Sequence, residues 1–128
     1  MARPIFPIVH ASLKDVPRYV QGLYMEHYGL SLVVTIRAAK AILWVHNRHG
    51  GAQLSFLLRK QHAMLATVIQ DLFGNVELHE EATGKTKLVT APLPHLWLEA
   101  AQIVEGVIRG CGAAENADLL FHFVRRAE

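Results

Sequence analysis

The sequence predicts an α+β fold in which helices pack against one mostly antiparallel sheet. Three observations predict it: three segments carry apolar residues at helical spacing, segments rich in β-branched residues lie between them, and two pairs of strand segments are joined as hairpins. The expected element order is α-β-β-α-β-β-α-β. We expect residues 1–128 to form a single domain, because a chain of 128 residues has little room for two independent cores.

The composition excludes several classes of protein. Apolar residues make up 52% of the chain and charged residues 19%, so the chain has enough apolar side chain to offset the entropy of ordering it. Its apolar runs are shorter than the roughly 18 residues that cross a membrane, and its first residues lack the features of a secretory signal. We therefore expect a cytoplasmic protein with no membrane partner.

Charge and cysteine content argue against a nucleic-acid partner, a disulfide and a thiolate zinc site. Lys and Arg number 13 against 11 Asp and Glu, and they are spread along the chain, so a nucleic-acid partner is not expected. The single cysteine, Cys111, excludes an internal disulfide and any zinc site built from several thiolates. Cys111 is expected at the core side of a helix end, as an inert thiol.

The first helix is expected between Ser12 and Gly29. Ser12 followed by Asp15 resembles a capping box, and apolar residues from Val16 onward recur at helical spacing. Because proline is tolerated in the first turn of a helix but not in its interior, Pro17 favours a regular helix that begins near Val16.

Two strands are expected next. The segment 31–37, SLVVTIR, is dominated by β-branched and aliphatic residues, which fit a pleated, half-buried surface. The segment 41–46, AILWVH, is apolar on both faces, so we expect a central strand that is covered on each side, with Trp44 in the core. The two strands form a hairpin, and turn residues follow them.

The segment 52–58, AQLSFLL, fits either a third strand or the start of a helix, because a short apolar run has no decisive period. We favour a helix that begins near Gln53 and ends at Gly74, since apolar residues from Leu54 to Phe73 line one side of it. Such a helix has about six turns.

The remaining chain predicts a hairpin, a helix and a strand. The segment 76–88 alternates apolar and polar residues around a Thr-Gly turn, which is typical of a β-hairpin. The segment 96–111 has an apolar face at helical spacing and is followed by glycine. The segment 118–124, DLLFHFV, places alternate apolar residues on one face of a last strand.

From Asp15 to Thr90 the predicted order is a helix, a hairpin, a stretch of aromatic, polar and arginine residues before glycine, a second helix and a second hairpin. This arrangement resembles the later half of heme/nitric-oxide-binding (H-NOX) domains and the related vinyl-reductase-like and TRAPP-like ligand-binding folds. In H-NOX domains a Tyr-x-Ser-x-Arg motif holds the heme propionates, and Trp44, His46 and Arg48 stand at the matching positions. The resemblance implies a sensor or regulatory role and an Arg48 that faces an anion.

Heme itself is not implied. The histidine that ligates heme in that family falls near Arg18 and Tyr19, where this chain has no histidine, and His27 lies about two turns later. An arginine still suits a carboxylate, because its planar group donates two parallel charge-assisted hydrogen bonds. We predict no cofactor. The candidate ligand-binding residues, for a small anion, are Trp44, His46 and Arg48.

Other chemistry has less support in the sequence. The eight histidines lack metal-ligand spacing, and the pair formed by His79 and Glu81 has no third ligand. No serine lies in a nucleophile elbow, and Gly50-Gly51 lacks the Lys-Ser/Thr continuation of a phosphate loop. We therefore predict neither catalytic residues nor a metal site.

Apolar content predicts how the chain works. A small domain with 52% apolar residues, a two-faced apolar strand and three apolar helix faces carries more apolar surface than one core covers. We predict a non-enzymatic cytoplasmic regulatory or adaptor domain that acts through protein–protein contact, as a homodimer or with an obligate partner, and is modulated by a small ligand. A well-filled monomer, a heme- or metal-binding sensor or enzyme that uses His27 or His46, and a nucleic-acid-binding module remain alternatives.

Overall fold

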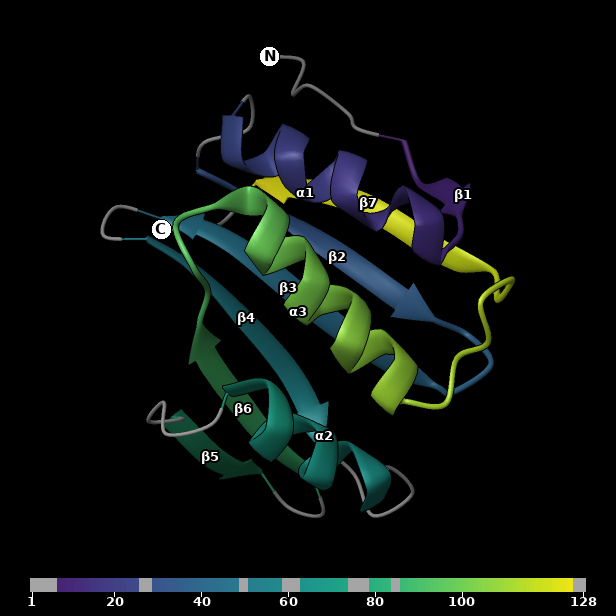
Figure 1. The fold of residues 1–128 in the computed structure, drawn as a ribbon, viewed down its shortest axis with the longest axis vertical. Coiled ribbons are helices and arrows are strands. Elements are labelled where there is room, and N and C mark those ends of the chain that lie inside the picture. The colour runs from purple at the N-terminus through teal and green to yellow at the C-terminus, as the bar shows by residue number, and fades with distance from the viewer. Residues whose placement is uncertain are drawn as a thin grey trace.

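The computed structural model describes residues 7–25, 29–48, 51–58, 63–73, 79–83 and 86–125. Within these ranges, seven strands form one sheet in the order β1-β7-β2-β3-β4-β6-β5, and each neighbouring pair is antiparallel. The elements shown in Figure 1 are β1 (Val9–Ala11), a 3₁₀ turn (Leu13–Asp15), α1 (Val16–Met25), β2 (Leu30–Ile36), β3 (Ala41–Arg48), β4 (Gly51–Leu58), α2 (Ala63–Phe73), β5 (His79–Thr83), β6 (Thr86–Pro92), α3 (Trp97–Gly110) and β7 (Leu119–Arg125). The predicted α+β class is confirmed.

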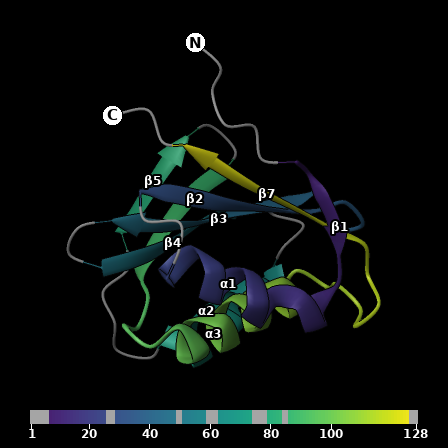
Figure 2. The same cartoon turned by 90° about the horizontal axis from the view of Figure 1, so that it is seen from above.

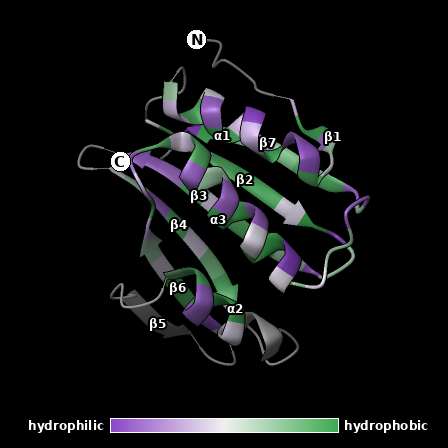
Figure 3. Ribbon diagram, viewed as in Figure 1, coloured by the Kyte–Doolittle hydropathy of each residue, from purple (hydrophilic) through white to green (hydrophobic). Residues whose placement is uncertain are grey.

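The three helices lie on the same side of the sheet, as Figure 2 shows with the strands seen nearly edge-on. Helix α1 contacts α3 and the strands β2 and β3, and α2 contacts α3. Figure 3 shows both helices α1 and α3 with alternating apolar and polar segments, whereas β2 is apolar along most of its length. The helices are therefore amphipathic, and each buries one side. Strand β2 has apolar residues on both of its faces, including the face that the helices do not cover.

The predicted element order is wrong in two places. Strand β4 occupies residues where we expected the start of a six-turn helix, and α2 begins only at Ala63. The reason is tertiary: β4 lies between β3 and β6 and pairs with both, and this pairing decides what a short apolar run leaves open. The second missed strand, β1, has three residues paired with β7, too few for a periodic signal.

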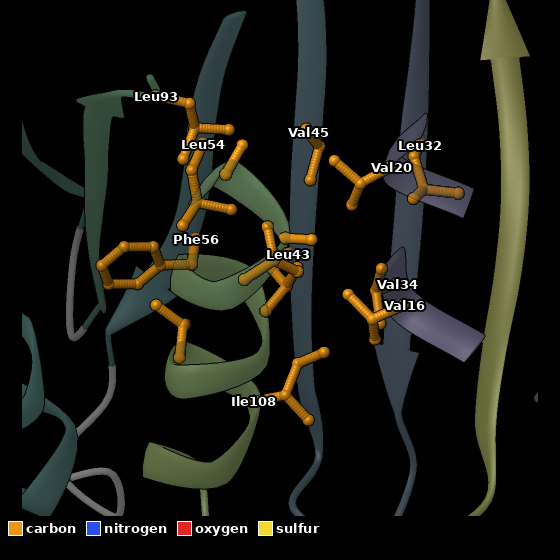
Figure 4. Packing of buried hydrophobic residues seen from close by; sticks show 14 of the residues in the cluster. Val16, Val20, Leu32, Val34, Leu43, Val45, Leu54, Phe56, Leu93 and Ile108 are labelled. Carbon is orange, nitrogen blue, oxygen red and sulfur yellow. The ribbon is translucent and has the colours of Figure 1, made fainter. Parts of the chain in front are cut away.

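The core lies between the helices and one face of the sheet. Val16, Val20 and Leu23 of α1 are at most 1% exposed and follow helical spacing. Burying each such side chain stabilises the fold by about 1.5–3 kcal/mol. Figure 4 shows how helix and strand residues meet in this layer. The strand residues labelled there are Leu32, Val34, Leu43, Val45, Leu54 and Phe56, all buried.

The start of α1 follows its sequence signals. The Asp15 carboxylate accepts hydrogen bonds from the backbone N–H of Ser12 at 3.0 Å and from its hydroxyl at 3.4 Å. Val16 is the first residue of the regular helix, with Pro17 in the first turn, as predicted. Beyond the helix, Gly29 has a φ of 84°, a conformation that glycine adopts without the steric cost of a Cβ.

Strand β3 is the central strand of the seven, as predicted, but the prediction that it is covered on each side is wrong. The helices cover the face that carries Leu43 and Val45. On the other face Ile42 is 37% exposed, and Trp44 is half-buried rather than a core residue. A strand that is apolar on both faces therefore lies here in a sheet whose described helices are all on one side.

A buried asparagine ties this central strand to α1. Asn47 is 9% exposed, and its Nδ2 donates a hydrogen bond to the Leu23 carbonyl at 2.8 Å. The carbonyl oxygen of Asn47 accepts a hydrogen bond from the Gly29 N–H at 3.3 Å. The side chain and backbone of one residue thus fix where α1 ends relative to β3.

Replacing Asn47 tests this tie. Because the change Asn47→Ala leaves a buried carbonyl without its partner, we expect it to lower the free energy of unfolding by about 1–3 kcal/mol. Urea denaturation measures the change. Gln102→Ala, at an exposed position of α3, is the control and should stay within about 0.5 kcal/mol. Equal stability of the two variants would show that the Asn47 bond contributes nothing.

Candidate functional site

The side of the sheet opposite the helices, which we call the open face, carries every second residue of each strand. Its membership follows from the strand register, because residues that alternate with the buried ones point away from the helices. The described side chains of the open face are His10 (β1); Leu120, His122 and Val124 (β7); Ser31, Val33 and Thr35 (β2); Ile42, Trp44 and His46 (β3); Gln53, Ser55 and Leu57 (β4); and Thr86, Leu88, Thr90 and Pro92 (β6).

None of these described side chains is Asp, Glu, Lys or Arg. The charged side chains that the structure describes lie on the helices, in the turns or near strand ends, such as Glu99 on α3 and Arg37 and Lys40 between β2 and β3. A sheet face in water usually carries polar and charged residues, whereas the centre of a protein interface is depleted of charge and enriched in aromatic residues. The described part of the open face therefore has the composition of an interface.

Trp44 lies at the centre of the open face. Its strand is the middle one of the sheet, and its direct neighbours across the strands are Val33 of β2 and Ser55 of β4. Next to Val33 lies His122 of β7. A large aromatic side chain that is half-buried among apolar and hydroxyl-bearing neighbours offers a flat contact surface.

The polar residues of the open face bond to one another. Ser31 Oγ and His46 Nδ1 share a hydrogen bond of 2.6 Å, and Ser55 Oγ and Thr90 Oγ1 share one of 3.1 Å. Ser31 is 1% exposed and Ser55 is 7% exposed. Polar groups that already have partners lose little when water is removed from them, so these pairs lower the cost of covering the face.

The structure brings two of the three predicted ligand-binding residues together. Trp44 and His46 are two residues apart on β3 and share the open face. Arg48 is the last residue of β3 and pairs with Gly51, and its side chain lies outside what the structure describes. The two residues therefore mark a region of the open face as the candidate ligand site.

The sequence prediction missed the contribution of the neighbouring strands. Ser31 and Val33 of β2 and Ser55 of β4 surround the predicted residues, and none of them was a candidate. The segment SLVVTIR contains a pattern that could have indicated the residues of β2. Its alternate residues Ser31, Val33 and Thr35 are all uncharged. An outward face without charge is detectable once the strand register is known.

The described part of the chain contains no candidate metal centre. No group of three His, Cys, Asp or Glu there is close enough to hold a metal ion. His10 Nδ1 lies 3.0 Å from Asp118 at the exposed rim, where the pair joins β1 to the segment before β7. His27 lies outside the described residues, as do the side chains of His79 and Glu81.

Cys111 lies where the sequence predicts it, at the C-terminal end of α3 and packed against the core. Burial raises the pKa of its thiol from 9.0 to about 11. The thiolate is the nucleophilic form of cysteine, so a thiol with a raised pKa reacts slowly near neutral pH. The geometry supports an inert cysteine.

The chain matches no protein-family model, no curated protein and no solved structure at a significant level. Among the described helices, none combines the length and the apolar character of a membrane span. The case for a function therefore rests on the residues of the open face.

The raised pKa of Cys111 predicts a stability loss in alkali. Folding favours the protonated thiol, so this stabilisation is complete below pH 9 and is lost as the pH rises through about 11. We expect the free energy of unfolding of Cys111→Ala to fall less over this range than that of the wild type, in urea denaturation at each pH. Tyr24, whose pKa burial raises to about 12, titrates in both proteins and cancels in the comparison. Parallel pH profiles would contradict the assignment.

Proposed function

We propose that this chain is a cytoplasmic, non-enzymatic regulatory or adaptor domain that works by binding a protein surface through the open face. One observation carries the proposal: the described side chains of this face include no charged residue around a half-buried tryptophan. Contiguous uncharged surfaces of this kind mark sites of protein contact. The location in the cytoplasm is part of the proposal and is supported by the single cysteine.

Covering Trp44 with a partner surface contributes a measurable binding free energy. A tryptophan buries about 200 Å² when fully covered. Because no more than about a third of Trp44 is exposed, covering the rest removes at most about 70 Å² from water and contributes at most about 1.8 kcal/mol. This corresponds to at most roughly 20-fold in affinity. Tryptophan at the centre of a patch is also the residue type that most often dominates binding energy.

The same composition argues for a protein partner over a nucleic acid. Nucleic-acid affinity comes largely from Lys and Arg that neutralise phosphates. The described side chains of the open face contain neither. Trp44 could stack on a base, but the electrostatic contribution that holds a strand in place would be missing there.

We also propose that a small anion modulates this contact beside Trp44 and His46, on the side toward the end of β3, where Arg48 is the last residue. The hydrogen bond between Ser31 Oγ and His46 Nδ1 holds the His46 imidazole in place on the face. A bound ligand changes the contact only if it binds one state of the protein better than the other. Because the anion would lie beside the protein contact, the two binding events are expected to be coupled.

Photo-crosslinking in the native host tests the proposed function. We expect benzoylphenylalanine at Trp44 to form covalent adducts with a protein, because the reactive group replaces one aromatic side chain by another at the centre of the face. Adducts are detected as a mass shift on a denaturing gel and identified by mass spectrometry.

The control carries the same group at Glu99, an exposed position of α3 on the helix side. Adducts from position 44 and none from position 99 support the proposal. Adducts from both positions at equal yield, or from neither, would contradict it.

A further inference from the structure

We propose that the occupant of the open face is a second copy of this chain, so that two sheets stack face to face across a two-fold axis. This inference rests on the proposed function and names its partner. Two sheets packed in this way form a sandwich whose inner faces lie about 10 Å apart. The three helices of each copy then lie on the outside.

The first argument is electrostatic. In a two-fold symmetric contact a residue near the axis meets its own counterpart, so any charged residue there meets a like charge. Like charges brought together in an interface cost several kcal/mol. The described side chains of the open face include no Asp, Glu, Lys or Arg, so the described part of the face can meet its own counterpart without like-charge repulsion. The register positions of Arg48 and Glu81 also belong to this face, and their side chains lie outside what the structure describes.

The second argument is size. The five strands β7, β2, β3, β4 and β6 span about 24 Å at a spacing of about 4.8 Å, and seven residues of strand extend about 23 Å. The flat area is about 550 Å² per copy before the relief of the side chains is added, about two thirds of the roughly 800 Å² per partner of a standard interface. One open face thus has room for one dimer contact at the small end of the range of specific interfaces.

The third argument concerns the polar groups that the contact would cover. The hydroxyls of Ser31 and Ser55 already hydrogen-bond within one copy, to His46 and Thr90. Ser31 and Ser55 are also already buried within one copy, so the contact removes little water from these two hydroxyls and gains the apolar area of Val33, Trp44 and their neighbours. Both sheets also have the same right-handed twist, which lets them align at about 30°.

The test compares substitutions of two exposed aliphatic residues that lie on opposite sides of the molecule. Ile42 on the open face is 37% exposed, and Leu98 on α3 is 53% exposed. We expect the wild type to sediment as a dimer of the 14.3 kDa chain. Ile42→Glu should weaken the dimer at least about 100-fold, because it places two carboxylates in one interface, whereas Leu98→Glu should leave it unchanged.

Two further readouts sharpen the test. Thr35→Lys, at the position paired with Ile42 on β2, should dissociate the dimer in the same way and replaces the first variant if that variant fails to fold by circular dichroism. Because the contact contains no described charges, the wild-type dimer should not weaken between about 0.1 M and about 1 M salt. Loss of the dimer at high salt would contradict the proposal.

The remaining outcomes separate this inference from the proposed function. A wild type that stays monomeric at about 100 µM overturns the second copy as the occupant. If position 44 then crosslinks to a different protein, the proposed function stands. A dimer that Leu98→Glu dissociates and Ile42→Glu does not would place the contact on the helix side and overturn the inference.

Discussion

The one-sided covering of the sheet is the constraint on which the rest of this structure depends. Each helix has one apolar side, and all three helices bury it against the same face of the seven strands. The sheet therefore has a second face that the described helices do not cover. Such a face stays in water cheaply if it is charged, and the described side chains of this one are not. The partner that we propose covers this face.

Folding and binding use different sides of the same strands. On the helix side Leu43, Val45 and Leu54 are at most 1% exposed, so the core is complete within one chain. On the open face the large apolar residues remain partly exposed. Because strand residues alternate between the two sides, a substitution on the open face changes the contact surface without opening the core. The hydroxyl and imidazole pairs fit this division, since they satisfy polar groups without adding charge.

Local signals in the sequence predicted the local parts of the structure. The first and third helices and the second hairpin follow from spacing, capping and turn residues that lie close together in the chain. Strand β4 could not be predicted in this way, since it is held by β3 and β6, and its partners in β6 lie 29 to 39 positions further along the chain. Periodicity over 52–58 contains no information about that pairing.

The candidate site was predictable only in part for a related reason. The pattern AILWVH correctly indicated a central strand that is apolar on both sides. It could not show whether the second side is covered by another helix of the same chain or by a partner, because both coverings select the same residues. Trp44 and His46 were found from their chemistry, whereas Ser31 and Ser55 became visible only through the strand register.

The most direct measurement of whether the open face is covered is the solvent accessibility of Trp44. The chain has two tryptophans, so Trp97→Phe leaves Trp44 as the only reporter. Acrylamide quenching of its fluorescence should decrease, and its emission should shift to shorter wavelength, as the protein concentration rises through the range where the dimer forms. Quenching and emission that stay constant over the whole concentration range would show that no second copy covers this face.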